Sequence, residues 1–306
     1  MHFAVTGGAG FVGSHLVNYL IKEGHSVSVI DNLSYGKKQN LTEVFDQIKF
    51  YQEDIRDFEA LKKILKNVDG VFHQAALTIV QDSFKKPQEY HDVNVSGTRN
   101  IFELAKEYGL KVVFASSSSV YGHKENMPIR ENAERKPINP YGKTKLDDEY
   151  LFEKYSNLGV SIIGLRYFNI FGKGQTLSYS GVITKFLDRI KKSKSPIIFG
   201  DGSQIRDFVF VGDVVKANLA AMENESSNLL VNIGSGKDTS ILQLAEMMID
   251  FSGLPLQVIF QEPLEGDVYK SHADISLAKI FFKWQPKMEL KTWLRKIISD
   301  KDFDDI

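Results

Sequence analysis

The sequence contains no cysteine. Disulfide bonds, cysteine-based zinc sites and thiol nucleophiles are therefore excluded. Its seven histidines show no paired spacing such as HExxH, so we expect no metal centre. The GxSxG motif of many serine hydrolases is also missing, which argues against that class of enzyme.

Neither positive nor negative charge dominates the chain. The formal net charge is −1, and 25% of the residues are charged, so we expect neither a nucleic acid nor an anionic membrane surface as a partner. Apolar runs fall short of the roughly 18 residues that a transmembrane helix needs. The first residues form a strand-like run without the basic and apolar regions of a signal peptide. We therefore expect a cytoplasmic protein.

The first half of the chain alternates short apolar runs with helical patterns. The runs expected to be strands are 3–5, 26–30, 48–51, 68–73, 111–115 and 161–165. This alternation predicts an α/β fold with a Rossmann-type, doubly wound parallel sheet. From about Phe171 glycine, serine and proline become frequent, which predicts a smaller C-terminal lobe. We expect a dinucleotide-binding domain over 1–170, which also receives parts of 204–233, and a mostly substrate-binding lobe over 171–306.

A glycine-rich loop follows the first expected strand. Residues 6–13 read TGGAGFVG, and the following residues show helical spacing. This context provides a tight turn, a close approach of the backbone to a pyrophosphate and a helix N-terminus. Asp31 ends the second expected strand, where its carboxylate favours the ribose of NAD and repels the 2′-phosphate of NADP. The cofactor contacts expected here are Gly7, Gly10, Phe11, Val12, Gly13, Asp31 and Asn32.

The chain resembles the extended short-chain dehydrogenase/reductase family, in its NAD-dependent epimerase/dehydratase branch. Besides the glycine loop, the resemblance rests on Asp54-Ile55, 73–76 (HQAA), 94–98 (NVSGT), 116–122, 141–145 (YGKTK), 166–172 and 206–208. It implies that Asp54 and Ile55 hold the adenine of NAD and that Ala75 and Ala76 line the cofactor channel. It also implies that Asn94 lies beside the nicotinamide end and that Tyr167 contacts the cofactor.

Tyr141 and Lys145 are four residues apart, a spacing that places both on one face of a helix. A free tyrosine titrates near pH ~10 and is a poor base at neutral pH, but a nearby ammonium and a positively charged nicotinamide both favour the phenolate. The resemblance implies that Tyr141 and Lys145 form the catalytic pair. It further implies that the hydroxyl of Ser117 shares the substrate proton with Tyr141.

The two positions after Ser117 narrow the class of reaction that the resemblance implies. Dehydratases that the chain resembles carry an acidic pair there, and sugar-acid decarboxylases keep a glutamate at the second position. This chain has Ser118 and Ser119. The resemblance then implies a 4-epimerase that interconverts UDP-glucose with UDP-galactose, and UDP-GlcNAc with UDP-GalNAc, through a transient 4-keto sugar.

The expected substrate contacts lie mostly in the second half of the chain. The resemblance implies that Asn169 and Arg206 bind the diphosphate, for which a guanidinium is well shaped, that Phe199 lies along the base and that Asp267 reaches the ribose. Ser117 and Ser118 are also expected to contact the substrate. One position departs from many hexose epimerases, because Leu264 stands where they carry a second phosphate-binding arginine.

Ser271 occupies a position where a tyrosine narrows the pocket of epimerases confined to plain hexoses. A small residue there predicts that 2-acetamido sugars are accepted. UDP-glucuronate epimerases share the run of four serines, but they carry an arginine soon after the Asn169 position, where this chain has Lys173. A UDP-glucuronate 4-epimerase is therefore the second candidate.

Two further functions stay open on this sequence. A nucleotide-sugar reductase or dehydratase would keep the fold, and a non-catalytic NAD-binding regulator would keep only the cofactor site. The resemblance also implies a homodimer, in which the helices around 89–108 and 141–155 pair with their twofold mates.

Overall fold

A seven-stranded, wholly parallel sheet forms the centre of the protein in the computed structural model, which describes residues 1–175 and 181–299. Its strand order is β11-β6-β5-β4-β1-β2-β3. The strands are β1 (His2–Thr6), β2 (Ser26–Ile30), β3 (Ile48–Tyr51), β4 (Gly70–His73), β5 (Lys111–Ser117), β6 (Ile162–Tyr167) and β11 (Leu229–Ile233). This order places a reversal of the winding between β1 and β4, where open α/β sheets bind ligands. The expected doubly wound fold is confirmed.

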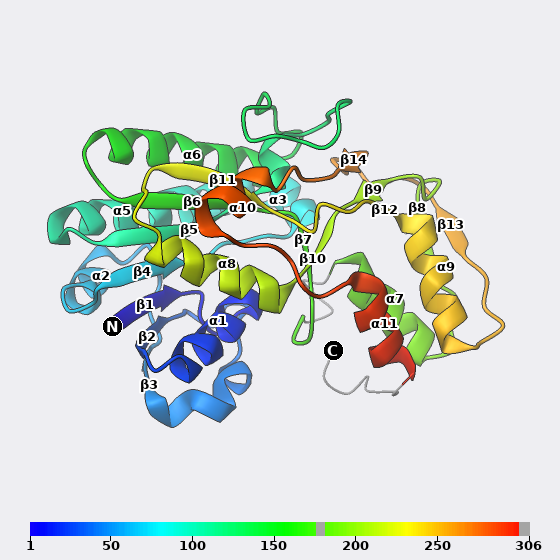
Figure 1. Ribbon diagram of the computed structural model, residues 1–306, viewed down its shortest axis with the longest axis horizontal. Coiled ribbons are helices and arrows are strands. Elements are labelled where there is room, and N and C mark those ends of the chain that lie inside the picture. The colour runs from blue at the N-terminus through cyan, green and yellow to red at the C-terminus, as the bar shows by residue number, and fades with distance from the viewer. Residues whose placement is uncertain (176–180, 300–306) are drawn as a thin grey trace.

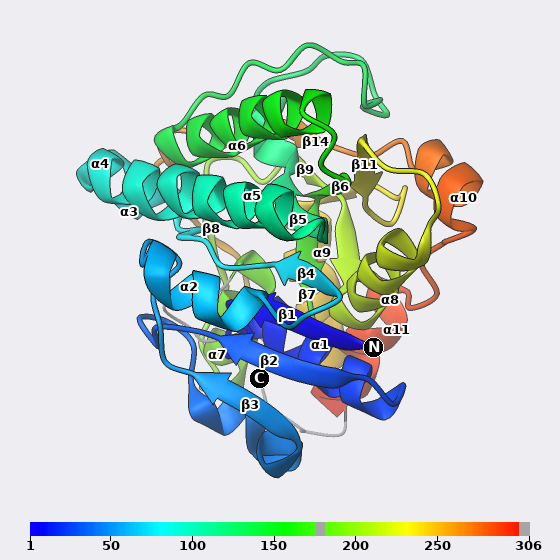
Figure 2. The same ribbon diagram turned by 90° about the vertical axis from the view of Figure 1, so that its left-hand side faces the viewer.

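Helices cover both faces of the sheet (Figures 1 and 2). On one face lie α1 (Phe11–Lys22), α8 (Val211–Glu223) and α10 (Ser276–Phe282). On the other lie α2 (Phe58–Leu65), α5 (Gly97–Tyr108) and α6 (Pro140–Asn157). The inner strands β1, β4 and β6 read as nearly continuous apolar runs because they are buried on both sides, whereas the edge strand β3 is not buried.

The helical segment between β4 and β5 is interrupted. It consists of α3 (Val80–Lys85), α4 (Pro87–His91), a π-helical turn (Asp92–Ser96) and α5. A helix tolerates proline in its first turn but not in its interior. Pro87 therefore begins α4 and ends the helical hydrogen bonding of α3 before it. The π-helical turn inserts one extra residue into the helix, a feature that is frequent at functional sites.

The smaller lobe packs against the carboxyl ends of the strands (Figure 1). Three helices surround its core: α7 (Val182–Lys191), α9 (Ile241–Ser252) and α11 (Leu290–Ser299). Its short strands are β7 (Asn169–Phe171), β8 (Ile197–Phe199), β9 (Ile205–Arg206), β10 (Phe208–Phe210), β12 (Thr239–Ser240), β13 (Ile259–Gln261) and β14 (Lys270–Ser271). The chain crosses between the two parts more than once, because α8, β11 and α10 pack on the large sheet.

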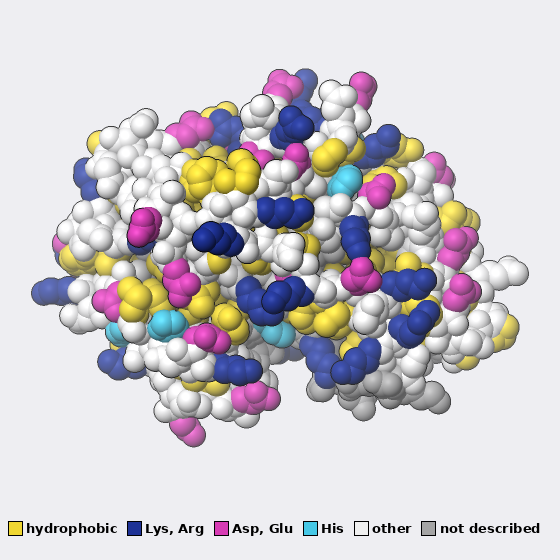
Figure 3. Space-filling view, viewed as in Figure 1, with side chains coloured by type: hydrophobic (Ala, Val, Ile, Leu, Met, Phe, Trp, Pro, Cys, Tyr) yellow, Lys and Arg dark blue, Asp and Glu magenta, His cyan; other side chains and the backbone are white. Residues whose placement is uncertain are grey.

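The surface carries both signs of charge. Figure 3 shows lysine and arginine side chains interspersed with aspartate and glutamate across the face in view. Within 1–175 and 181–299, no helix combines the length and the apolar character required to cross a bilayer.

Candidate active site

A cavity of about 670 Å³ lies between the carboxyl ends of the central strands and the smaller lobe. Its walls include the glycine loop after β1, the end of β2 and the segments after β4 and β5, together with residues of β8, β9 and α7 from the lobe. A cavity of this size and position is typical of a small-molecule site.

The glycine loop brings bare backbone to the cavity wall. Gly7 has a φ of +67°, and a Cβ on it would lie 2.7 Å from the backbone nitrogen of Ala75. A Cβ on Gly13 would lie 2.1 Å from the carbonyl oxygen of Gly7. Only glycine fits these two positions, and the N-terminus of α1 consequently approaches the cavity. This arrangement suits a pyrophosphate, and Gly7, Gly10, Phe11, Val12 and Gly13 all line the cavity.

Asp31 and Asn32 line the cavity at the end of β2. The carboxylate of Asp31 accepts hydrogen bonds from the backbone N–H groups of Ala9 (2.9 Å) and Leu33 (2.8 Å). Burial raises the pKa of Asp31, and these two N–H groups oppose that effect. The remaining acceptor positions of the carboxylate suit ribose hydroxyls, so the site fits NAD.

Two of the expected cofactor residues do not line the cavity. Ile55, Ala75, Ala76 and Tyr167 do, whereas Asp54 and Asn94 contact lining residues without lining the cavity themselves. The carboxylate of Asp54 accepts hydrogen bonds from Asn32 and from the guanidinium of Arg56, which lowers the pKa of Asp54 to about 2. Asp54 therefore holds the side chain of Asn32 in place by a hydrogen bond, and Asn32 lines the cavity.

Asn94 is fully buried in the π-helical turn. Its carboxamide oxygen accepts from the backbone N–H of Leu77 at 2.8 Å, and its amide nitrogen donates to the carbonyl of Leu77 and to Oγ1 of Thr144. Leu77 lines the cavity, and Thr144 lies on α6. Asn94 thus joins the wall after β4 to the helix that carries Tyr141.

Tyr141 and Lys145 both lie on the first turns of α6 and line the cavity with Ser117. The helix begins at Pro140, and Asn139 caps it by accepting from the backbone N–H of Gly142 at 2.7 Å. The ammonium of Lys145 donates to the backbone carbonyl of Ala115 at 3.1 Å. These contacts bring the three expected catalytic side chains to one wall.

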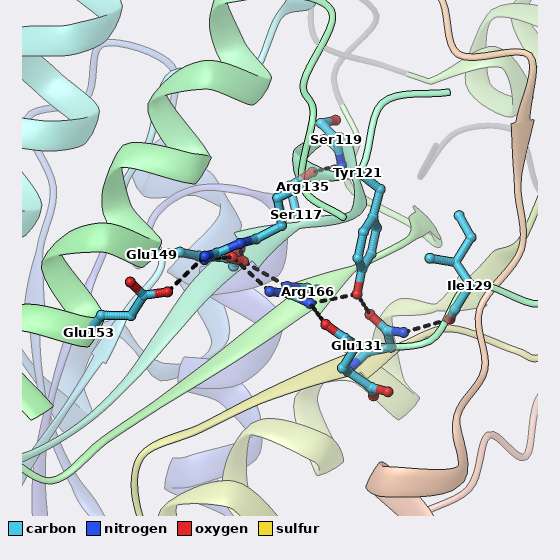
Figure 4. A network of polar contacts seen from close by, with 11 residues as sticks. Ser117, Ser119, Tyr121, Ile129, Glu131, Arg135, Glu149, Glu153 and Arg166 are labelled. Carbon is cyan, nitrogen blue, oxygen red and sulfur yellow. Dashed lines mark hydrogen bonds and ion pairs between the residues drawn. The ribbon is translucent and has the colours of Figure 1, made fainter. Parts of the chain in front are cut away.

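A buried ionic network fixes the end of β5 behind Ser117 (Figure 4). Arg166 on β6 donates two hydrogen bonds to the carboxylate of Glu149 on α6, at 2.7 and 2.8 Å. The same carboxylate accepts from the hydroxyl of Ser116 at 2.7 Å. Ser117 is the next residue, and its Oγ accepts from the backbone N–H of Ser119 at 3.1 Å. The network therefore ties β5, β6 and α6 together beside the cavity.

The expected substrate residues lie on the other half of the same cavity. Those that line it are Ser118, Asn169, Phe199, Arg206, Asp267 and Ser271. Arg206 on β9 forms an ion pair with Asp267, so these two groups are partners before any ligand binds. Leu264 also lines the wall.

Sequence reasoning missed several residues on this wall. Lys185 on α7 lines the cavity and is exposed at its edge, and Glu53 lines it beside Ile55. The only signal for Lys185 was a polar position on an amphipathic helix, which does not tell the cavity from the outer surface. Among the residues that the structure describes, the cations on the wall are Lys145, Lys185 and Arg206.

Comparison with known proteins gives the family. The model of the NAD dependent epimerase/dehydratase family matches residues 3–234. A Methanocaldococcus jannaschii protein, provisionally named UDP-glucose 4-epimerase, is 42% identical over 96% of this chain and 96% of its own length.

Two solved structures carry different sugars. The UDP-N-acetylglucosamine 4-epimerase of Methanobrevibacter ruminantium, in complex with UDP-N-acetylmuramic acid, is 37% identical with a TM-score of 0.91 and covers 97% of this chain and 96% of its own. The UDP-glucuronic acid 4-epimerase of Bacillus cereus, with UDP-glucuronic acid and NAD, is 32% identical with a TM-score of 0.91 and covers 98% of this chain and 99% of its own. The glycine loop, the Asp31 site and these matches agree, and the chain belongs to the NAD-dependent epimerase/dehydratase family.

Proposed function

We propose that the protein is a 4-epimerase of UDP-linked hexoses, which interconverts UDP-glucose with UDP-galactose and UDP-GlcNAc with UDP-GalNAc. The observation that carries this proposal is that Tyr141, Lys145 and Ser117 line the same cavity as the glycine loop. The carboxylates on the described wall are Asp31 and Glu53 in the cofactor half, and Asp267, which is paired with Arg206. Among the described residues, the wall beside Ser117 therefore carries no carboxylate pair of the kind that water elimination uses.

The chain's own residues supply proton transfer and positioning. Bound NAD supplies a reversible hydride acceptor. The phenolate oxygen of Tyr141 takes the proton of the sugar 4-hydroxyl and later returns it, and the hydroxyl of Ser117 hydrogen-bonds that sugar oxygen. The ammonium of Lys145 stabilises the phenolate of Tyr141. A 4-keto sugar held only through its nucleotide turns over between the two proton transfers, which inverts C4.

The size of one wall residue supports acceptance of N-acetylated sugars. Ser271 on β14 lines the cavity, and its side chain is small. A glucuronate carboxylate would need an available cation near the sugar, and two of the three cations on the described wall face carboxylates: Lys145 faces Asp148 and Arg206 faces Asp267. UDP-glucuronate remains the second candidate, favoured by the likeness to the Bacillus cereus enzyme.

Lys185 offers a second positive charge for the diphosphate. Leu264 provides no charge at the position where many hexose epimerases carry arginine. The guanidinium of Arg206 is already paired with the carboxylate of Asp267. Lys185 lies on the same cavity wall, on the first turns of α7. We infer that Lys185 and Arg206 together bind the diphosphate, with Asn169 beside them.

The reaction is tested with purified protein and no added cofactor. UDP-glucose, UDP-GlcNAc and UDP-glucuronate are incubated separately, and the 4-epimers are separated by chromatography. Conversion of the first two supports the proposal, and faster conversion of UDP-glucuronate would replace the substrate assignment. Steady consumption of added NADPH with a 4-keto sugar would instead identify a reductase, and absence of any reaction would favour a regulator.

We also propose a homodimer through α5 and α6. The two helices pack side by side on one face of the sheet, and Tyr150 on α6 and Leu158 just after it are exposed. Light scattering should give twice the mass of one chain, and a monomer would contradict this assembly.

A further inference from the structure

The carboxylate of Asp148 lies buried against the ammonium of Lys145. Asp148, one turn further along α6, places Oδ2 at 3.1 Å from the ammonium nitrogen. The side chain of Lys145 is 5% exposed and that of Asp148 is 0% exposed. The ammonium has three N–H donors. One goes to Asp148 and one to the carbonyl of Ala115, which leaves one for the cavity.

Among the described residues, Lys145 is the one cation that pairs with Asp148. The groups that face it are Lys145 and Asp147 on α6, and the hydroxyl of Thr98 on α5. His73 on β4 lies beside the pair, and burial and then the charge of Lys145 lower the pKa of His73 to about 3, so its ring is neutral. The ring bridges Thr6 (2.7 Å) and Thr98 (2.9 Å). Lys145 is therefore the counter-ion of Asp148 in the described part of the chain.

Stability does not explain why a carboxylate stands here. A buried ion pair repays the desolvation of its two charges only when both are well hydrogen-bonded. Oδ1 of Asp148 has no hydrogen-bond partner in the described ranges. Burial raises the pKa of Asp148 to about 6, against the opposing effect of Lys145. This pKa lies far below the range in which tyrosines titrate, near pH ~10, so the carboxylate is ionised in that range.

We propose that Asp148 is a positioning residue for Lys145, which holds the ammonium against the carbonyl of Ala115 and offsets part of the positive charge that acts on Tyr141. The inference rests on the proposed function in taking Tyr141 as the proton-transfer group. An epimerase uses this group twice, first as a base and then as an acid. A phenol made too acidic by an uncompensated ammonium would return its proton slowly, so partial compensation suits a reaction that runs in both directions.

The size of the effect follows from the helix. Tyr141 and Asp148 are seven residues apart, which is about 10 Å along the axis. At that distance, with an effective dielectric constant of about 20 to 40, one unit charge moves a titration by about half to one pH unit. Removal of the negative charge should therefore move the ionisation of Tyr141 to lower pH by that amount.

The test titrates Tyr141 without any sugar. The ultraviolet difference signal of tyrosinate is followed against pH in the NAD-loaded protein, and subtraction of the Tyr141→Phe protein isolates one tyrosine. Asp148→Asn should lower the midpoint by about half to one pH unit. Asp148→Glu should leave the midpoint near that of the natural protein because the charge is kept. If Asp148→Asn does not fold, Asp148→Ser carries the same prediction.

Asp147→Asn is the matched control, because Asp147 neighbours Asp148 on α6 but pairs with Lys143 at 2.7 Å. An unchanged midpoint in folded Asp148→Asn, or an equal shift in Asp147→Asn, overturns the proposal. With a sugar that is turned over, the acid limb of the kcat profile should move by the same amount as the tyrosinate signal. A shifted tyrosinate midpoint in a protein that converts no sugar would support the role of Asp148 and contradict the proposed function instead.

Discussion

Arg206 and Asp267 form an ion pair on the cavity wall, where β9 meets the segment before β14. Both residues were expected to contact the nucleotide, and in the structure they contact each other. The positive charge that Arg206 offers to a diphosphate is therefore partly compensated. We therefore expect Lys185 on α7, which lines the same cavity, to take a larger share of diphosphate binding.

Lys185→Met should raise KM for the UDP-sugar by about tenfold, because one charge-assisted contact to phosphate contributes about 1.5 kcal/mol. The effect on kcat should be small, since the contact exists in both the ground state and the transition state. Steady-state kinetics of conversion measure both constants. Lys192→Met is the control, because Lys192 lies at the end of the same helix and pairs with Asp188. Equal KM values for the two variants would remove Lys185 from the site.

Tyr141→Phe should lower kcat by at least about 100-fold, since it removes the group that transfers the proton. Bound NAD should be retained, because the glycine loop and Asp31 are unchanged. Conversion is measured by chromatography, and NAD content is measured after denaturation of the protein. Tyr19→Phe provides the control, on α1 and away from the cavity wall. Full activity in Tyr141→Phe would contradict the assignment of the catalytic group.

Ser271→Tyr should narrow the cavity beside the sugar. We expect kcat/KM for UDP-GlcNAc to fall by about tenfold or more relative to that for UDP-glucose, because an overfilled pocket costs at least about 1 to 3 kcal/mol. Ser271→Ala, which adds no bulk, should preserve the ratio. If Ser271→Tyr lowers kcat/KM equally for UDP-GlcNAc and UDP-glucose, this residue does not select the 2-substituent of the sugar.

Glu149→Gln should destabilise the fold. Glu149 is completely buried against Arg166, whose side chain is 2% exposed, so loss of the carboxylate leaves a buried guanidinium without its counter-ion. The expected cost is about 3 to 5 kcal/mol in the free energy of unfolding by urea. Glu153→Gln removes an exposed partner of Arg135 and should cost at most about 1 kcal/mol. Similar losses in the two variants would show that the network does not stabilise the sheet.

The sequence predicted the sheet well because its signals are local. The strand expected at 26–30 is β2 itself, and that at 48–51 is β3. The glycine loop could be placed because a strand, a tight turn and a helix follow each other within a few residues. The same reasoning put Asp31 on the cavity wall, where the structure has it.

Sequence patterns could not place residues whose position depends on packing between distant segments. The π-helical turn at Asp92–Ser96 leaves no periodic signal, so nothing indicated that Asn94 would bond Leu77 behind the wall. Asp148 is three residues from Lys145, and this spacing alone allows contact. Its complete burial depends on the packing of α6 against α5 and β5, which no local pattern reveals.

The fate of the hydrogen at C4 tests the central claim most directly. UDP-glucose that carries deuterium at C4 is incubated with the purified protein and no added cofactor, and the product is examined by mass spectrometry and nuclear magnetic resonance. Our account predicts UDP-galactose that keeps the deuterium at C4, because the hydride leaves and returns within one closed site. Loss of the deuterium to solvent, or net accumulation of reduced cofactor, would contradict it.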